Sequence, residues 1–373
     1  MSKKRVSPVR KRRKRKLVLF IIEIIVFLVL LLALFFWLKL QKINHTSLDE
    51  EALGAVDSEL LTGYTNIALF GLDNRSMGNL SSGNSDVIMV MSIDNSSGEI
   101  NLVSVYRDTF LAQSESDSDT SYSYRKANAA FSNGGVEEAI RMLNTNLDLN
   151  ITDYVTVDFQ ALIDAIDIVG GVEITLTDSE VSLINTYIDE LEEWTGGSST
   201  HISSAGTYTL DGIQATAYCR IRHTGNGDFG RAQRQRKVLA GLFSKVKSSG
   251  LVTANKVIDA VLPEVETSLT STEIVALATK VIGYDIGNTS GFPFDLVTGS
   301  YTGVGSIDIP CTLESNVTEL YSFLFGVDDY TPSETVQEIS SYIENYTGKS
   351  ESDAVDYGIE DDELSTSDDS SDE

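Results

Sequence analysis

Residues 65–73 of this 373-residue chain read TNIALFGLD, an apolar run that ends at a glycine and an aspartate. A short apolar run bounded by turn residues is typical of a buried strand. Two similar runs follow, SDVIMVMSID at 85–94 and EINLVSVYRD at 99–108, and the turn-rich NSSG joins them. Three strands in close succession therefore predict a sheet, onto which the later segments must pack.

The later segments alternate between the two kinds of secondary structure. Strands are predicted at 154–159, at 172–176 and near 292–298, and helices at 134–147, 160–171, 210–222, 230–248, about 253–262 and 271–284. Residues 113–123 are expected to form a surface loop, and residues 178–205 an irregular insertion. Alternating strands and helices predict one α/β domain over residues 61–330, with helices packed on a central sheet.

The N-terminus carries the signals of a membrane anchor. Residues 1–16 hold ten basic residues and no acidic one, and residues 17–38 are apolar except for Glu23. At about 1.5 Å per residue, this helix would cross a hydrocarbon core of roughly 30 Å. A secretory signal peptide is the competing interpretation, but the apolar stretch is too long and no cleavage site follows it. We therefore predict a cytoplasmic segment at 1–16, a transmembrane helix at 17–38 and a juxtamembrane linker at 39–60.

The basic flank predicts that everything after residue 40 lies outside the cell membrane. The chain has 55 Asp plus Glu against 28 Lys plus Arg, so this external part is strongly acidic. Such a charge opposes nonspecific nucleic-acid binding. Residues 331–373 are predicted to be an acidic, largely disordered tail. Cys219 and Cys311 are the two cysteines, and the sequence does not decide whether they pair.

A concentration of basic residues in residues 220–239, RIRHTGNGDFGRAQRQRKVL, contrasts with the acidic chain. Guanidinium groups bind phosphate oxygens bidentately, and a helix start adds positive potential. The side chains predicted to bind phosphate here are Arg220, Arg222, Arg231, Arg234 and Gln235. Asp228 is predicted to orient an arginine or to act as a base. The alternative is pairing with acidic residues on a solvated surface, which is favoured for Arg236 and Lys237.

A second polar set lies at the predicted strand ends. Asp73 follows the first strand, Asp86 opens the second, and Arg107 and Asp108 close the third. Ligands of open α/β sheets bind near the carboxyl ends of the strands. Two carboxylates with phosphate oxygens form a site suited to Mg²⁺, although single aspartates here are often turn or cap residues. No phosphate-binding loop, nucleophile elbow or zinc-ligand spacing is found.

Over residues 64–250 the chain resembles the LytR-CpsA-Psr family of bacterial cell-wall enzymes. The resemblance rests on an ordered series of motifs: NIALFGLDNR, SDVIMVMSID, INLVSVYRDTFL, KANAAFSNGG, LIDAIDIVGGVEI, LDGIQATAYCRIRH and GDFGRAQRQRKVL. The resemblance implies an α/β fold with a central mixed β-sheet flanked by helices, which enclose an apolar tunnel for a polyprenyl chain. It also implies a cell-wall function in a Gram-positive bacterium.

The resemblance implies a role for each matched residue. Asp73 and Asp86 would hold Mg²⁺ (or Mn²⁺) on a pyrophosphate. Arg107, Arg220, Arg222, Arg231 and Gln235 would surround the phosphates, and Asp228 would assist proton removal. Arg107, Asp228 and Arg231 are the residues expected to be catalytic. Two departures stand out: Arg236 occupies the place of a second Gln, and the loop after Arg107 is more acidic and less proline-rich than is usual.

The leading hypothesis for function is a phosphotransferase. It would move an anionic glycopolymer, of the teichoic acid or capsular type, from a polyprenyl pyrophosphate carrier to peptidoglycan. A hydrolase acting on the same lipid pyrophosphate and a non-catalytic, membrane-anchored wall-polymer receptor are the alternatives. A transcriptional regulator, another alternative, lacks support because no DNA-binding module is found in the sequence. The sequence does not choose the polymer.

Overall fold

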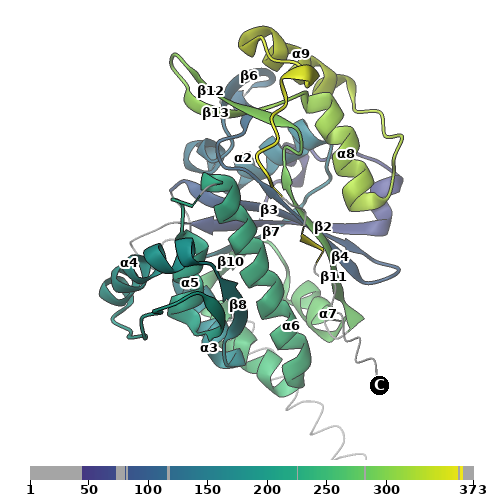
Figure 1. Cartoon of the computed structure of the whole chain (residues 1–373). Coiled ribbons are helices and arrows are strands. Elements are labelled where there is room, and N and C mark those ends of the chain that lie inside the picture. The colour runs from purple at the N-terminus through teal and green to yellow at the C-terminus, as the bar shows by residue number, and fades with distance from the viewer. Residues whose placement is uncertain are drawn as a thin grey trace, which may run out of the picture. The chain divides into compact units, whose positions relative to one another are not determined.

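The three predicted strands form the middle of an eight-stranded sheet (Figure 1). They are β2 (Tyr64–Leu72), β3 (Ser85–Asp94) and β4 (Glu99–Val105), each antiparallel to the next. The computed structural model describes residues 44–72, 80, 83–115, 118–224, 226–280, 283–359 and 362–363. These described residues form one compact unit.

The sheet is mixed, as the resemblance implied. Strand β7 (Asp153–Val157) runs parallel to β2, and β11 (Asp285–Phe292) runs parallel to β4. The remaining strands extend the two sides: β1 (Asn44–His45), β10 (Val265–Thr267) and β14 (Asp362–Glu363). In this arrangement the carboxyl ends of β2, β4, β7 and β11 meet the amino end of β3 at one edge.

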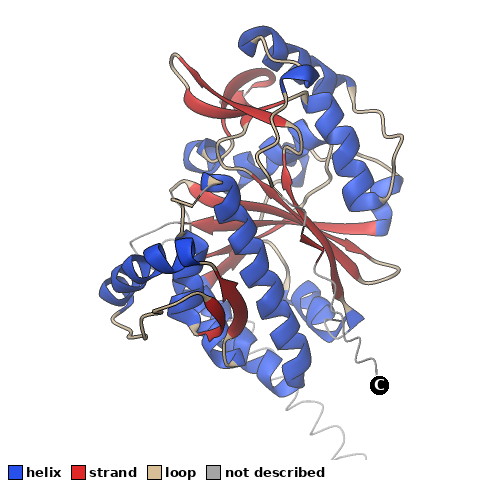
Figure 2. Cartoon of the chain, viewed as in Figure 1, coloured by secondary structure: helices blue, strands red, loops and turns tan. Residues whose placement is uncertain are grey.

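Helices cover both faces of the sheet (Figure 2). One face packs against α2 (Ala129–Leu147), α8 (Leu313–Phe325) and α9 (Glu334–Thr347), together with the hairpins β5–β6 (Phe110–Glu115, Ser118–Lys126) and β12–β13 (Leu296–Tyr301, Gly305–Pro310). Alternation along β2 directs Ala68 and Phe70 into this core. Burial of these apolar side chains drives the packing.

The opposite face packs against α3 (Phe159–Val169), α5 (Gly212–Arg220) and α6 (Gly227–Val261), with the hairpin β8–β9 (Val172–Leu176, Gly206–Leu210) outside them. Gly170 ends α3 with φ 83°, a conformation that glycine adopts without steric cost. Helix α6 bends at Gly250, where two predicted helices are joined into one element. Helix α7 (Ser271–Lys280) follows β10.

Three segments differ from their predictions. The strand predicted near 292–298 is divided between the end of β11 and the start of β12. Residues 178–195 form helix α4 instead of an irregular insertion, beginning with a capping box between Thr177 and Glu180. Ile184, Ile188 and Leu191 on this helix are fully buried, so packing stabilises it. The expected loop at 113–123 is largely part of the β5–β6 hairpin.

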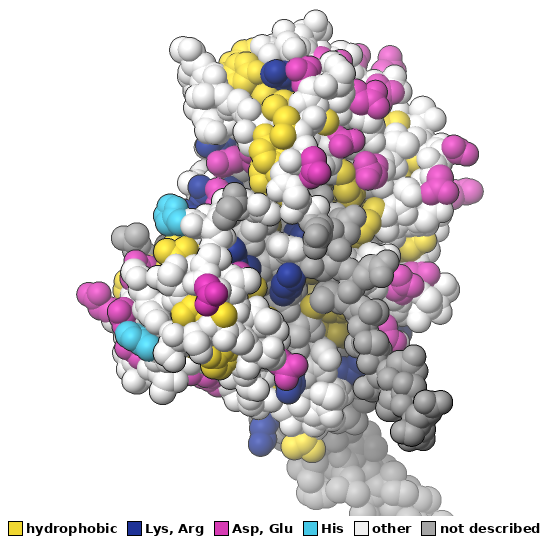
Figure 3. Space-filling model, in the orientation of Figure 1, with side chains coloured by type: hydrophobic (Ala, Val, Ile, Leu, Met, Phe, Trp, Pro, Cys, Tyr) yellow, Lys and Arg dark blue, Asp and Glu magenta, His cyan; other side chains and the backbone are white. Residues whose placement is uncertain are grey.

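The domain also continues beyond residue 330, where the acidic tail was expected to begin. Helix α9 buries Val336, Ile339 and Ile343 in the same core as α2. Asp148 holds its start, because its carboxylate accepts hydrogen bonds from the Ser333 backbone N–H and hydroxyl, both at 2.6 Å. Figure 3 shows Asp and Glu side chains on the surface around α8 and α9. An acidic composition here belongs to the exposed face of a folded segment.

The predicted linker is likewise partly folded, because Leu53, in the 3₁₀ turn Glu50–Leu53, is fully buried in the core. Among the residues described, no helix combines the length and apolar character needed to cross a membrane. The predicted basic segment 1–16 and transmembrane helix 17–38 lie outside the described residues. Both cysteines are buried and neither forms a disulfide.

Candidate active site

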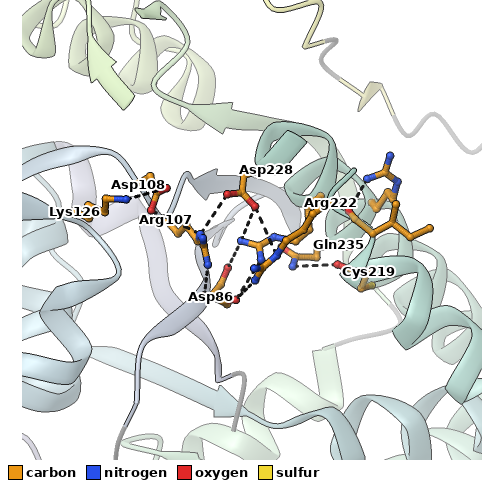
Figure 4. A network of polar contacts seen from close by, with 11 residues as sticks. Asp86, Arg107, Asp108, Lys126, Cys219, Arg222, Asp228 and Gln235 are labelled. Carbon is orange, nitrogen blue, oxygen red and sulfur yellow. Dashed lines mark hydrogen bonds and ion pairs between the residues drawn. The ribbon is translucent and has the colours of Figure 1, made fainter. Parts of the chain in front are cut away.

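Charged side chains gather at the sheet edge where the strand ends meet (Figure 4). Asp86 lies at the start of β3, and Arg107 is the second residue after β4. Asp228 and Arg231 lie in the first turns of α6, and Arg222 lies in the turn before it. We call these five residues the edge cluster. All five were predicted from the sequence as site residues.

Aromatic packing brings the start of α6 to the end of β4. The Tyr106 and Phe229 rings meet edge to face, with centroids 4.6 Å apart. On the other side of Tyr106, a Cβ added to Gly291 of β11 would lie 1.9 Å from the tyrosine hydroxyl. A larger residue at this position would displace the buried Tyr106 ring. The neighbours of these aromatic residues, Arg107 and Asp228, are thereby held close together.

Asp86 is the centre of the cluster. Its Oδ1 accepts a hydrogen bond from Arg107 Nη1 at 2.8 Å. Its Oδ2 accepts from Arg222 Nη2 and lies 3.2 Å from Arg231 Nη1. One carboxylate therefore contacts three guanidinium groups, each of which comes from a different segment of the chain.

Asp228 contacts the same three arginines from the helix side. Its carboxylate oxygens lie 3.2 Å from Arg231 Nη2, 3.4 Å from Arg107 Nε and 3.9 Å from Arg222 Nε. The cluster thus contains three guanidinium groups and two carboxylates. Its net positive charge lies beside the start of α6, where the helix dipole adds positive potential.

Burial and charge together set the ionisation of these groups. Burial opposes the charged form of Asp86, but Arg231, Arg107 and Arg222 hold the pKa of this carboxyl below its ordinary value. Burial lowers the pKa of Arg231, although Asp228 and Asp86 oppose this effect. Because guanidinium starts near 12.5, Arg231 remains charged. Asp86 and Arg231 therefore form a charged pair at neutral pH.

A cavity of about 500 Å³ begins at the edge cluster and extends between the sheet and helices α3, α5 and α6. Asp86, Arg222 and Arg231 line its charged end. Its apolar wall consists of Leu69, Val87, Met89, Val155, Val157, Phe159, Leu162, Val238 and Leu239. Met89 lies three residues along β3 from Asp86, and Leu239 lies about two turns along α6 from Arg231. The apolar part therefore reaches about 10–12 Å inward.

Arg220, Gln235 and Cys219 also line the cavity. The guanidinium group of Arg220 pairs with Glu190 at 3.1 Å and lies 4.5 Å from the centre of the Trp194 ring. Gln235 Nε2 makes a long contact of 3.5 Å with the Cys219 carbonyl oxygen. Burial raises the pKa of the Cys219 thiol to about 12, so this cysteine stays neutral.

Arg234 is directed away from the edge cluster. It donates to Glu180 Oε1 at 2.8 Å, to the Ile221 carbonyl oxygen at 2.9 Å and to the Thr224 hydroxyl. These contacts fix the turn that carries Arg222, so they favour a positioning role over the predicted contact with phosphate. The expected solvated position of Arg236 is wrong. This side chain is fully buried, because α6 packs against α3, α5, β4 and β11.

Sequence reasoning missed two charged residues beside the cluster. Lys126, at the end of β6, lies 3.2 Å from Asp108 Oδ2. Asp308, in β13, donates its backbone N–H to the Asp108 carbonyl oxygen at 2.9 Å. A charged residue between Ile307 and Ile309 was the available signal, since both isoleucines are fully buried. No strand was predicted there.

Several atoms in and beside the edge cluster have unused hydrogen-bonding capacity. Among the residues that the structure describes, Arg107 Nε, Asp108 Oδ1 and Asp228 Oδ1 are buried and make no hydrogen bond. Buried polar atoms are normally satisfied, so such a group indicates a place for a polar ligand. The free Arg107 N–H suits a ligand oxygen, whereas the two carboxylate oxygens suit a hydroxyl donor or a cation.

Asp73, the other predicted metal ligand, lies outside the described residues. Within the described part of the chain, no group of three or more His, Cys, Asp or Glu side chains is arranged to hold a metal ion. Asp86 is thus the one predicted metal ligand whose position is described. Its carboxylate is the hard oxygen donor that Mg²⁺ prefers, and Mg²⁺ is commonly held by one or two carboxylates together with phosphate oxygens.

Comparisons with known proteins agree with this fold. A Streptococcus agalactiae structure covers 79% of this chain and 98% of its own, with a TM-score of 0.59 and 22% identity. The structure of TagV from B. subtilis covers 72% of this chain and 98% of its own, with a TM-score of 0.54 and 26% identity. The first likeness shows the fold alone.

Two curated relatives are similar over their shared region. One is the polyisoprenyl-teichoic acid–peptidoglycan teichoic acid transferase TagV of Bacillus subtilis, 31% identical over 54% of this chain and 49% of the relative. The other is biofilm regulatory protein A of Streptococcus mutans, 30% identical over 58% of this chain and 52% of the relative. The chain therefore spans about half the length of these relatives. The model of the LytR_cpsA_psr family matches residues 32–291. The chain belongs to the LytR-CpsA-Psr family.

Proposed function

We propose that this protein is a phosphotransferase that moves an anionic glycopolymer from a polyprenyl pyrophosphate carrier to peptidoglycan. One observation carries the proposal: a net-positive arginine cluster lies at one end of an apolar cavity. A lipid pyrophosphate has the matching chemistry, with negative oxygens next to a long apolar chain. A cavity of about 500 Å³ is within the roughly 300–1,000 Å³ of ligand sites.

The names of relatives support this choice. Besides the Bacillus subtilis transferase, a relative from Enterococcus faecalis is named polyisoprenyl-teichoic acid–peptidoglycan teichoic acid transferase TagU, with 29% identity over 57% of this chain. A structure of the same fold is titled TagT bound to LI-WTA. Teichoic acid is accordingly the proposed class of polymer, and a capsular polysaccharide is the second candidate.

The edge cluster would stabilise charge during the transfer. Arg107, Arg222 and Arg231 would bind the phosphate oxygens, and Arg220 would lie beside them in the cavity wall. Because these guanidinium groups are already held by Asp86 and Asp228, they need little reorganisation when the ligand binds. Phosphoryl transfer depends mainly on such alignment and charge stabilisation. Asp228 and Asp86 would therefore act first by orienting the arginines.

A divalent cation is part of the proposal. Asp86 and Asp73 would hold Mg²⁺ or Mn²⁺ together with phosphate oxygens, a donor set that suits a hard cation. Such an ion would neutralise charge on the pyrophosphate. We also propose that residues 17–38 anchor the chain in the cell membrane, with the catalytic domain outside. The peptidoglycan acceptor and the lipid carrier would then both be within reach.

Mass spectrometry of the full-length protein, purified from its native membrane, tests the lipid assignment. The expected result is a polyprenyl pyrophosphate, or its glycosylated form, bound to the wild-type protein. Val155→Trp fills the apolar cavity and should lower the lipid content about tenfold or more, because the polyprenyl chain loses its space. Arg107→Ala should lower it as well, through loss of a charged contact.

The same preparations separate the possible activities. Donor and peptidoglycan together should yield attached polymer and polyprenyl phosphate. Polyprenyl phosphate released equally without peptidoglycan would identify a hydrolase instead. Binding without turnover would identify a receptor. A wild-type protein that carries no lipid and binds no polyprenyl pyrophosphate would overturn the proposal.

A further inference from the structure

Asp308 is a buried carboxylate that points to the edge cluster from outside the region that the family model matches. The match ends at residue 291, and Asp308 lies in β13. Its neighbours Ile307 and Ile309 are buried in the apolar core, so strand alternation directs Asp308 to the other side. The residue is buried, with 7% of its surface exposed.

The hairpin holds Asp308 firmly in this position. Its backbone N–H donates to the Asp108 carbonyl oxygen at 2.9 Å, and a parallel bridge joins it to Thr109. Its carboxylate interacts electrostatically with Asp108, Asp228, Lys126 and Arg107. Among the described residues, however, it makes no hydrogen bond or salt bridge. A largely buried carboxylate held beside other charged groups is typical of functional sites.

The edge cluster borders the apolar cavity on one side and a second group of charged residues on the other. Arg222 and Arg231 line the apolar cavity, whereas Asp108, Lys126 and Asp308 do not. Figure 4 shows Arg107 between these two sides, with Asp108 and Lys126 on one and Arg222 and Gln235 on the other. Ion pairs connect them in series, since Arg107 contacts Asp86 and Asp228 as well as Asp108.

The direction of the proposed reaction indicates which side receives the leaving group and which side receives the acceptor. This step rests on the proposed function, in which the leaving group is polyprenyl phosphate. Its apolar chain occupies the cavity, so the leaving oxygen faces the cavity side. In phosphoryl transfer the attacking and leaving oxygens are roughly in line through phosphorus. The acceptor hydroxyl must therefore approach from the side of Asp108, Lys126 and Asp308.

We propose that Asp308 is the catalytic base that takes the proton of the acceptor hydroxyl. The hydroxyl oxygen forms a new bond to the phosphorus on the polymer side. The bond from that phosphorus to the bridging oxygen breaks, and polyprenyl phosphate leaves with the electron pair. The hydroxyl proton passes to the Asp308 carboxylate and later to solvent. No oxidant, reductant or nucleotide is required.

The surroundings of Asp308 suit this role. Burial, followed by the charges of Asp108 and Asp228, raises its pKa to about 7, while Lys126 and Arg107 oppose the rise. A base is most effective when its pKa lies near the working pH. The other carboxylates are less available: Asp228 contacts three guanidinium groups, and Asp108 is paired with Lys126.

Asp308→Asn in the full-length protein tests the proposal, because asparagine keeps the shape but accepts no proton. The probes are a synthetic polyprenyl pyrophosphate disaccharide and an uncrosslinked peptidoglycan oligomer. Wild-type kcat should rise with pH and level off above about 7, since the carboxylate must be deprotonated. Asp308→Asn should lower kcat roughly 100- to 10,000-fold and remove this rise, with donor affinity within about threefold of wild type. Asp308→Glu should restore part of the rate.

Asp153→Asn is the matched control. Asp153 is also a carboxyl whose pKa is raised by burial, but it opens β7 at the opposite edge of the sheet. This variant should keep the wild-type pH profile. Asp308→Asn with wild-type kcat and an unchanged pH profile would overturn the inference while leaving the transferase proposal intact. Loss of turnover together with equal loss of donor binding would also overturn it. Wild-type protein without turnover would instead count against the proposed function.

Discussion

Asp86 and Asp148 are two poorly exposed aspartates with opposite surroundings. Asp148 is 2% exposed and accepts hydrogen bonds from neutral donors, namely Ser333 and the Tyr330 hydroxyl at 3.0 Å. Asp86 receives three guanidinium groups and faces a cavity. Asp148 joins the start of α9 to the end of α2. Asp86 instead contacts three guanidinium groups, whose total positive charge exceeds its own negative charge.

The difference separates a structural carboxylate from a functional one. Neutral donors satisfy Asp148 within the protein and leave no excess charge for a ligand. Around Asp86, three cations meet two carboxylates, so the cluster attracts further negative charge. Burial alone therefore does not indicate the role of an acidic residue. The net charge of the groups that contact it is more informative. The same isosteric substitution at both positions makes this contrast testable.

The largest effect is expected for Asp86→Asn. Loss of its charge leaves Arg107, Arg222 and Arg231 with mutual repulsion and one remaining carboxylate. We expect polymer transfer per folded molecule to fall about 100- to 1,000-fold, the range found when one electrostatic contact of an active site is lost. Initial rates with matched amounts of folded protein measure it. Wild-type rates would show that Asp86 only supports the fold.

Asp148→Asn should have the reverse pattern. Asparagine keeps one acceptor oxygen and places an NH₂ donor where the second carboxylate oxygen accepts from Ser333, so the free energy of unfolding should fall by about 1.5–3 kcal/mol. The melting temperature should then drop by roughly 2–5 °C. Transfer per folded molecule should stay within about twofold of wild type. A rate loss as large as that of Asp86→Asn would erase the contrast between the two sites.

Glu180→Gln tests an intermediate case, a buried acid paired with Arg234 outside the cavity. Burial opposes ionisation of Glu180, but the Thr177 backbone N–H, Arg234 and the Thr177 hydroxyl together lower its pKa. A lowered pKa in the folded state gives stability that is present above the unfolded pKa of about 4.3 and is lost as pH falls through the folded pKa.

We therefore expect Glu180→Gln to be less stable than wild type by about 1 kcal/mol at pH 7. The difference should shrink as pH falls below about 4, because wild-type Glu180 becomes neutral too. Denaturant unfolding at both pH values measures this. A difference that persists unchanged in acid would mean that the charge of Glu180 contributes nothing to the fold.

Local patterns were enough to predict the sheet. The strand predicted at 85–94 has the same bounds in the structure, and its hairpin with β4 follows from the NSSG turn. Helix α4 was missed although its signals were present: a capping box at Thr177 and Glu180, and apolar residues at helical spacing. The helix was not predicted because most of its residues are polar and only a narrow apolar face is buried. Helix α9 was missed for the same reason.

The edge cluster was predictable because its residues follow from strand ends and a helix start. Asp86 and Arg107 share an edge once β3 and β4 pair, and Asp228 precedes Arg231 by one helical turn. Lys126 and Asp308 reach the site through hairpins whose docking depends on tertiary packing. No local pattern fixes that docking, so their place required the structure.

The β12–β13 hairpin has a consequence for the biosynthesis of the protein. Chains are made from the N-terminus, and domains fold as their elements become available. A nascent chain that has not reached β13 already contains the residues of the arginine pocket but not Asp308. Because β13, α8 and α9 also supply apolar side chains to the main core, a chain that ends before β13 should fail to complete its fold, so both lipid binding and turnover depend on synthesis of the whole domain.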